Sequence, residues 1–135
     1  MTPTQKLLVK RSWETVMPMK ETASDIFYNH LFDEYPEVKA YFKADIKVQE
    51  LKLMMMINTV VHALDNLETL IEPIKRLGMK HVEYGVKKDD YDKVCASLLW
   101  TLEQILKDDF TADVHEAWTV IYTLIANHMI DGAEY

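Results

Sequence analysis

The sequence predicts an all-α protein with six or seven helices. Apolar residues recur along most of the chain at the 3.6-residue spacing of an amphipathic helix, and no segment shows the alternation of a strand. The chain has only three Gly and four Pro, too few for the many turns of a β-sandwich or barrel. Its 135 residues are enough for one hydrophobic core, so we expect a single domain over residues 1–135.

Composition and charge exclude several classes of protein. A net charge of −7 disfavours a nucleic-acid partner. No apolar run reaches the ~18 residues of a membrane span, and the N-terminus lacks the apolar segment of a signal peptide. The single cysteine, Cys95, excludes an intrachain disulfide and fits a reducing compartment. We therefore expect a cytoplasmic protein, monomeric or weakly dimeric.

Three helices are predicted in the first third of the chain. Residues 2–5 form a capping-box pattern that begins the first helix, and Pro18 ends or interrupts it. A second helix is expected from about residue 19 to 35. A short third helix should span residues 36–42, and the apolar pattern then loosens into a loop at 43–47.

The rest of the chain predicts four more helical segments, two of them long. One should run from about residue 48 to 64, and the next should begin at Glu72-Pro73 and end at Gly85. Two apolar helices, at about 91–106 and 111–129, should follow. We expect these last two to pair as an antiparallel hairpin.

His81 interrupts the apolar stripe of its predicted helix. Ile74, Leu77, His81 and Val82 share one face, so an imidazole stands where the pattern calls for an apolar side chain. This histidine is either a core residue satisfied by a backbone carbonyl or a ligand aimed at a metal. The other histidines show no such signal: His30, His62 and His115 should be solvated, and His128 partly buried.

Two more polar residues lie on or beside apolar helix faces. Tyr28 sits among aromatic residues, as a core tyrosine with a paired hydroxyl or as a hydrogen-bond donor to a pocket. Gln49 is four residues before Leu53 on the same face, as a partly exposed helix-start residue or as a polar group inside a site. Phe42 stands at the mouth of the 43–47 loop, where a buried anchor is the ordinary role.

Several short motifs recur in a particular order from about residue 5 to 130. They are Phe27-Tyr28-x-x-Leu31-Phe32, Pro36-Glu37-Val38, Phe42, Gln49 with Lys52-Leu53, Asn66-Leu67, Lys80-His81, Gly85-Val86, Tyr91, Ala117-Trp118 and Tyr122. In this order and spacing the chain resembles the globins. It is most similar to the single-domain bacterial haemoglobins of the Vitreoscilla type and to the globin half of flavohaemoglobins. The resemblance implies a globin fold of six to eight helices around a haem b pocket.

On one side of the haem, the resemblance assigns roles to three residues. His81 corresponds to the proximal ligand of the haem iron, and Tyr91 to the tyrosine that supports this histidine. Lys80 is a candidate partner of a haem propionate. Ferrous haem with one axial histidine keeps its sixth position open, so a five-coordinate iron is expected.

On the other side, the resemblance assigns roles to five residues. Phe42 corresponds to the aromatic that wedges the haem, and Lys52 is a second candidate propionate partner. Gln49 and Leu53 correspond to positions of the distal helix over the ligand site, and Tyr28 to the distal tyrosine that hydrogen-bonds O₂. A phenol and an amide at these places would favour slow oxygen release.

The resemblance also contains one departure. Related bacterial globins carry a Glu near the end of the last helix, which completes a His–Tyr–Glu relay on the proximal side. The aligned residue here is Ala133, and Glu134 follows it. One residue is a turn of ~100° around a helix. Either the alignment slips, or the relay is absent or taken by Asp131 or Glu134.

The implied function is reversible O₂ binding, for storage or transport, with CO and NO as further possible ligands. This makes the chain an oxygen-binding haem protein rather than an enzyme in its own right. An alternative is a nitric oxide dioxygenase or nitrite reductase, which would need an external reductase because 135 residues leave no room for a flavin domain. A third alternative is a haem-free globin-like sensor, and the presence of His81, Tyr28 and Gln49 argues against it.

Overall fold

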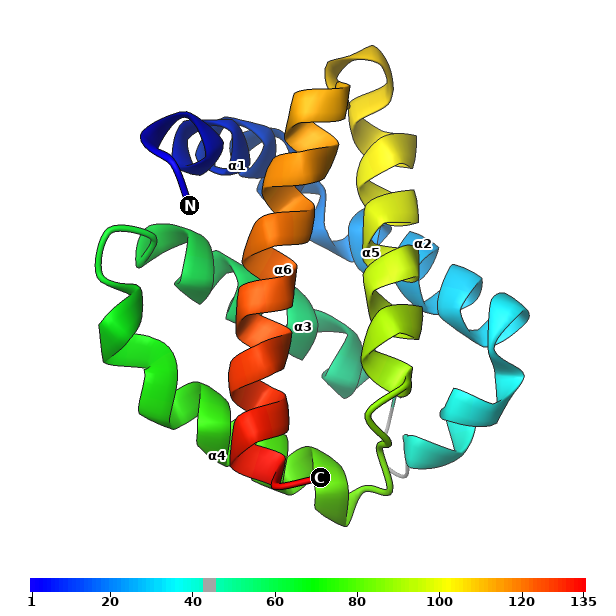
Figure 1. Ribbon diagram of the computed structural model, residues 1–135. Helices are drawn as coiled ribbons and strands as arrows, with labels where there is room; N and C mark the ends of the chain where they lie inside the picture. Colours follow the sequence, from blue (N-terminus) through cyan, green and yellow to red (C-terminus); the bar gives the residue numbers. More distant parts are fainter. Residues whose placement is uncertain (43–45) are drawn as a thin grey trace.

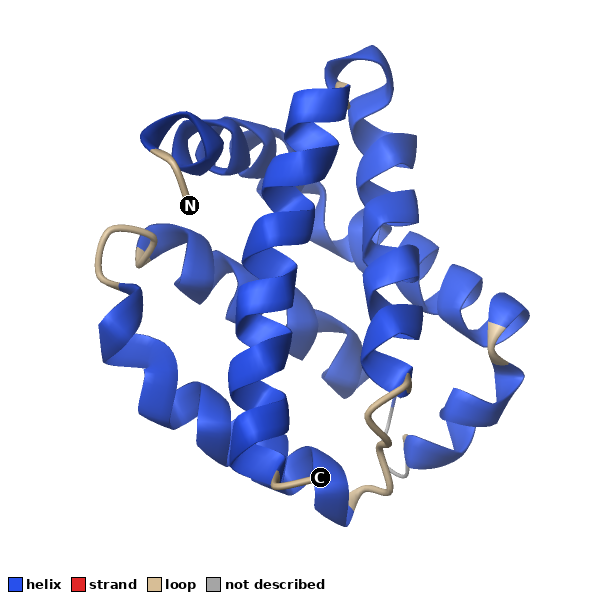
Figure 2. Ribbon diagram, in the orientation of Figure 1, coloured by secondary structure: helices blue, strands red, loops and turns tan. Residues whose placement is uncertain are grey.

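The computed structural model describes the backbone of residues 1–42 and 46–135, and the side chains of residues 1–42 and 51–135. Throughout these residues all regular secondary structure is helical, which confirms the expected all-α class (Figure 2). No helix in this part of the chain is long and apolar enough to cross a membrane.

Six α-helices and four short 3₁₀ helices make up the described chain (Figure 1). The α-helices are α1 (Pro3–Val16), α2 (Lys20–Glu34), α3 (Ile46–His62), α4 (Ile71–Glu83), α5 (Asp90–Leu106) and α6 (Ala112–Ala133). The 3₁₀ helices are η1 (Met17–Met19), η2 (Pro36–Tyr41), η3 (Leu67–Leu70) and η4 (Lys107–Asp109). All the expected helices are present. η3 was not expected, and residues 43–45 of the predicted loop lie outside the described residues.

Local chemistry explains where three of these helices begin or end. Thr2 and Gln5 form the predicted capping box, with reciprocal backbone-to-side-chain hydrogen bonds of 3.0 and 3.1 Å. Thr111 caps α6 by accepting a hydrogen bond from the Val114 N–H at 3.3 Å. Gly85 follows α4 with a φ of +94°, a conformation that glycine adopts without strain.

The largest interface between helices joins α4 to α6, and the next joins α2 to α5. Two glycines permit the close approach of α4 and α6. A Cβ atom on Gly78 would lie 2.0 Å from the Met129 carbonyl oxygen, and one on Gly132 would lie 2.3 Å from the Lys75 carbonyl oxygen. The expected hairpin of α5 and α6 does run antiparallel (Figure 1), but each of these helices packs more extensively on an earlier one.

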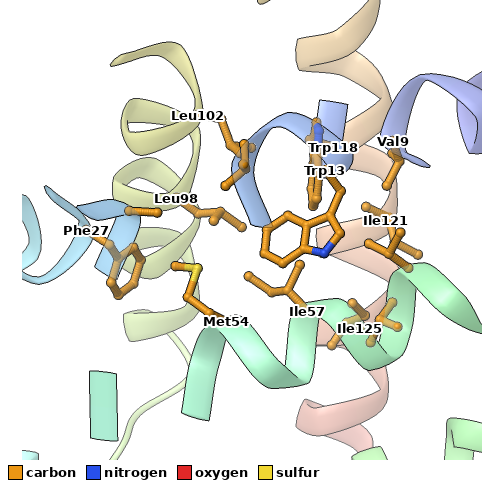
Figure 3. Packing of buried hydrophobic residues seen from close by; sticks show 14 of the residues in the cluster. Val9, Trp13, Phe27, Met54, Ile57, Leu98, Leu102, Trp118, Ile121 and Ile125 are labelled. Atoms are coloured by element: carbon orange, nitrogen blue, oxygen red, sulfur yellow. The ribbon is translucent and has the colours of Figure 1, made fainter. Parts of the chain in front are cut away.

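The hydrophobic core holds α1 against α3 and α6. Figure 3 shows side chains from α1, α2, α3, α5 and α6 converging around Trp13. The Trp13 ring centroid lies 5.9 Å from that of Trp118, and both indoles donate hydrogen bonds, to Asn58 Oδ1 at 3.0 Å and Ser12 Oγ at 2.8 Å respectively. Because α6 also packs on α4, this core fixes the position of the helix that carries His81.

The histidines outside α4 follow the sequence prediction with one exception. His62 and His115 are exposed and His128 is half-buried, as expected. His30 was expected to be solvated, but it is half-buried between α2 and α5. Its Nδ1 atom lies 2.8 Å from Ser97 Oγ, and its ring stacks on Trp100 with centroids 4.9 Å apart. The prediction was wrong because α5 covers a face of α2 that carries no apolar stripe.

Candidate functional site

The imidazole of His81 is held by its own helix. The Nδ1 atom lies 2.8 Å from the Leu77 carbonyl oxygen, one turn earlier in α4. Because a carbonyl oxygen can only accept a hydrogen bond, Nδ1 carries the hydrogen and Nε2 keeps its lone pair. His81 is half-buried, and burial lowers the pKa of its imidazole while the bond to the Leu77 carbonyl opposes that shift. The lowered pKa favours the neutral ring, which is the form that binds a metal through Nε2.

Tyr91 supports this histidine from the start of α5. Its ring stacks on that of His81 at a centroid distance of 6.4 Å and an interplanar angle of 24°. The hydroxyl of Tyr122 in α6 donates a hydrogen bond to the Tyr91 carbonyl oxygen, which anchors the backbone. The hydroxyl of Tyr91 itself is buried and has no hydrogen-bond partner among the described residues. Burial raises the pKa of Tyr91, so this phenol stays protonated.

Among the described residues, Tyr91 makes no hydrogen bond with Asp131 or Glu134, the two carboxylates that the sequence left open for a proximal relay. Asp131 and Glu134 are both exposed, and Glu134 ends α6 in the left-handed region with a φ of +57°. Neither side chain makes a described hydrogen bond or ion pair. The last residue, Tyr135, donates a hydrogen bond from its hydroxyl to the Val86 carbonyl oxygen. The left-handed backbone conformation of Glu134 directs Tyr135 toward Val86.

Tyr28 and Phe42 belong to one aromatic cluster. Tyr28 is buried in α2 and makes edge-on contacts with Phe27 at 4.9 Å and with Phe42 at 5.5 Å between ring centroids. Phe42, half-buried just after η2, also meets Phe32 edge-on at 5.4 Å. Such edge-to-face pairs have defined geometry, so the cluster fixes the direction of the Tyr28 ring.

The predicted site residues of α3 and α4 differ in exposure. Leu53 is half-buried and packs against the core, whereas Lys52 and Lys80 are exposed at the surface. Gln49 belongs to the first turn of α3, but its side chain lies outside the described residues. An aliphatic side chain faces inward here while two ammonium groups face solvent.

An apolar pocket lies between α3 and α4, and two residues of the apolar stripe of α4 line it. It has a volume of about 140 Å³ and its lining residues are Met56, Thr59, Val60, Leu70, Pro73, Ile74 and Leu77. Ile74 and Leu77 share the helix face of His81, although His81 itself does not line the pocket.

A buried carboxylate joins the two parts of the site. Asp90 accepts hydrogen bonds of 2.8 Å from the Tyr41 hydroxyl, the Lys87 N–H and the Lys93 ammonium. Tyr41 precedes Phe42 and Asp90 precedes Tyr91, so this link ties the segment that carries Phe42 to the start of α5, from which Tyr91 stacks on His81.

Sequence reasoning missed Tyr41, Asp90 and Tyr135. The spacing of Asp90 and Lys93 at i and i+3 on a helix was a readable sign of an ion pair. No local pattern indicated the contact of Asp90 with Tyr41, because the two residues are 49 positions apart.

These features fit a haem. One imidazole with a free Nε2 is the donor set for an iron whose four other ligands come from a porphyrin. The apolar lining of Ile74 and Leu77 suits a flat apolar ring, and exposed Lys52 and Lys80 suit its carboxylates at the rim. The Tyr91 ring, which stacks on the imidazole, carries a buried hydroxyl with no hydrogen-bond partner among the described residues.

Comparison with known proteins gives a consistent result. A family model described as Globin matches residues 25–129. Neuroglobin-1 of Oncorhynchus mykiss is 30% identical over 146 residues, covering 98% of this chain and 92% of that protein. The structure of a bacterial globin from Campylobacter jejuni superposes with a TM-score of 0.86 at 29% identity, covering 98% of this chain and 96% of that one.

A second group of relatives is much longer. The flavohaemoprotein of Vibrio cholerae is 31% identical over 131 residues, which cover 90% of this chain and 33% of that protein. The chain thus spans about a third of the length of the flavohaemoproteins that it matches.

Proposed function

Because this chain belongs to the globin family, whose haem-binding fold implies haem b, we propose that it binds O₂ reversibly at a haem iron held by His81. Members of the family bind O₂ and other gaseous ligands. The proposed role is therefore oxygen binding, storage or transport, with CO and NO as further ligands.

One observation carries this proposal. The Leu77 carbonyl takes the Nδ1 hydrogen of His81 and leaves Nε2 as a free base on a helix face that otherwise buries apolar side chains. His62 makes the same local bond, from Nδ1 to the Asn58 carbonyl oxygen at 2.8 Å, but it is exposed. Burial, rather than the bond alone, distinguishes His81 as the candidate ligand.

A bound haem would supply an iron with one open coordination position. Tyr28 would donate a hydrogen bond to a gas ligand with negative character, and Phe42 and Leu53 would pack around the ring and exclude water. Gln49, in the first turn of α3, is proposed as a second donor. A neutral hydrogen bond contributes ~0.5–1.5 kcal/mol, or about a decade of affinity at most.

A second candidate function follows from the similarity to flavohaemoproteins. A nitric oxide dioxygenase would use the same residues and would need electrons from an external reductase. Stopped-flow measurement of NO consumption by the oxygenated protein, with and without a reductase, separates the two functions. Turnover that persists only with the reductase would favour the enzyme.

The test of the proposed function is an absorption spectrum of the reduced protein before and after O₂ or CO. The expected spectrum is that of a five-coordinate ferrous haem, which changes with each gas. His81→Ala should abolish stable haem binding, and added imidazole should restore it. His62→Ala is the matched control, because it removes an imidazole with the same local hydrogen bond.

Two results would contradict the proposal. The assignment of His81 is wrong if His81→Ala keeps the five-coordinate ferrous spectrum without imidazole. A low-spin ferrous spectrum in the absence of gas would indicate an internal sixth ligand, which O₂ would first have to displace.

A further inference from the structure

The outer face of α4 carries a row of side chains that lie in solvent. Four exposed residues recur there at the spacing of one helical stripe: Glu72, Arg76, Met79 and Glu83. This outer stripe lies opposite the buried face of α4, which packs closely on α6 at Gly78. Figure 1 shows α4 at the edge of the molecule. The outer stripe is therefore open to contact with another molecule.

Apolar side chains lie in and beside the outer stripe. Met79 is 56% exposed, more than any other large apolar side chain in the part of the chain that the structure describes. Val82 and Tyr84, at the end of the same helix, are 42% and 49% exposed. A single exposed apolar residue needs no explanation, whereas several close together indicate an interaction site.

The charges of the outer stripe are arranged so that the stripe complements itself. Arg76 and Glu83 lie about 10 Å apart along the helix axis, and neither forms an ion pair among the described residues. When two copies of α4 run antiparallel about a two-fold axis near Met79, Arg76 of one copy faces Glu83 of the other. The symmetry forms this pair twice, as a self-complementary two-fold interface requires.

The charge of the whole chain also favours a second copy as the partner. Two copies repel each other over most of their surfaces, because each carries a net charge of −7. In α4, by contrast, the cations outnumber the carboxylates. They are Lys75, Arg76 and Lys80 against Glu72 and Glu83. A purely acidic or purely basic partner would meet like charges on the outer stripe, whereas a second copy in the reverse direction meets opposite charges.

We propose that two copies of this chain associate through the outer stripes of α4, with Met79 near the two-fold axis and Arg76 opposite Glu83 of the second copy. One helix face from each copy buries less than the ~1,600 Å² of a standard interface, so the dimer is weak and depends on concentration. The inference goes beyond the proposed function, and it places the contact on the helix that carries His81.

The test exchanges the two charges. Arg76→Glu, Glu83→Arg and the double variant are prepared in the full chain. Arg11→Glu is the matched control, because Arg11 is exposed on α1 and its substitution changes the net charge by the same amount as Arg76→Glu. Sedimentation velocity from low micromolar to near-millimolar protein measures the dimer dissociation constant, and circular dichroism checks that each variant is folded.

Each single reversal should raise the dissociation constant by about fivefold to thirtyfold, because it replaces two attractive ion pairs with two repulsive ones. The double variant should restore the constant of the natural protein. An equal mixture of Arg76→Glu and Glu83→Arg should also form dimers, since each copy then meets its opposite charge at both pairs. Arg11→Glu should change the constant far less than Arg76→Glu.

Three results would overturn the inference. The first is a chain that stays monomeric at near-millimolar concentration. The second is a dimer that both single reversals leave unchanged, because its interface would then lie elsewhere. The third is a mixture of the single variants that stays monomeric, because Arg76 would then not face Glu83. None of these measurements needs haem, so they decide the inference whether or not the proposed function holds.

Discussion

The Tyr41 hydroxyl donates a 2.8 Å hydrogen bond to the buried carboxylate of Asp90, 49 residues further along the chain. The same carboxylate accepts from the Lys93 ammonium, which also pairs with Glu37 at 3.1 Å. η2 is thereby held against the start of α5 by two contacts, Tyr41 with Asp90 and Glu37 with Lys93. The backbone of Gly85 also lies close to the Tyr41 ring, since a Cβ atom built on Gly85 would be 3.6 Å from it.

The first prediction concerns this link. Tyr41→Phe should lower the free energy of unfolding by about 1 kcal/mol, because it leaves one lone pair of a buried carboxylate without its donor. Asp90→Asn should cost more, since it weakens three hydrogen bonds at once. Both substitutions should also speed haem loss, and thermal unfolding with haem-transfer kinetics would measure the two effects. Equal haem-transfer rates in all three proteins would show that the link does not hold the haem pocket closed.

The second prediction concerns acid. Burial acts to raise the pKa of Asp90, but hydrogen bonds from Lys93, the Lys87 N–H and Tyr41 bring it below its usual range. The folded state then binds fewer protons than the unfolded state near a carboxyl pKa of about 3.9. The stabilisation from Asp90 is present above that pKa and is lost as pH falls through the lower folded pKa. The stability difference between the natural protein and Asp90→Asn should therefore shrink at acid pH, as denaturant titrations at several pH values would measure.

The third prediction concerns the crossing of α4 and α6. Gly78→Ala would place a methyl group 2.0 Å from a backbone oxygen of α6, which no side-chain rotation can relieve. We expect a loss of about 1–3 kcal/mol in unfolding free energy and weaker haem binding, because α4 carries His81. Met79→Ala is the control, since Met79 is the next residue of α4 and is exposed. Comparable melting temperatures for the two variants would argue against the close contact.

The fourth prediction concerns Tyr28. Tyr28→Phe should speed O₂ dissociation by up to about tenfold and CO dissociation less, because CO carries less negative charge than O₂ when bound. Flash photolysis and stopped-flow mixing measure the two rates. Tyr35→Phe, also a tyrosine on the C-terminal side of α2, serves as control. Equal effects on both gases would mean that Tyr28 does not contact the ligand.

Periodicity accounts for what could be predicted from the sequence. The stripes of α3, α4, α5 and α6 follow from hydrophobic spacing, and the caps at Thr2 and Thr111 follow from local hydrogen bonding. His81 could be singled out for the same reason, because a polar residue on an apolar stripe is visible in one dimension. Tyr28 was visible in this way as well.

What could not be predicted depends on which helices meet. From the sequence alone, Gly78 indicates only a loss of helix propensity in α4. Its role in the close packing of α4 against α6 becomes clear only from the structure. His30 lies outside any stripe, and its burial depends on α5. Tyr41 and Asp90 each look like ordinary surface residues of their own segments. Tyr135 follows the last periodic residue, and only the left-handed backbone at Glu134 directs it toward Val86.

The hydrogen bond from His81 Nδ1 to the Leu77 carbonyl bears on how the holoprotein is assembled. Metal binding to histidine normally competes with protons and requires the ring to settle into one tautomer. Here the Leu77 carbonyl favours the tautomer with the hydrogen on Nδ1, and burial lowers the pKa of the imidazole. If His81 binds haem as proposed, capture of haem by the apoprotein should release fewer protons at this position than it would with a fully exposed imidazole.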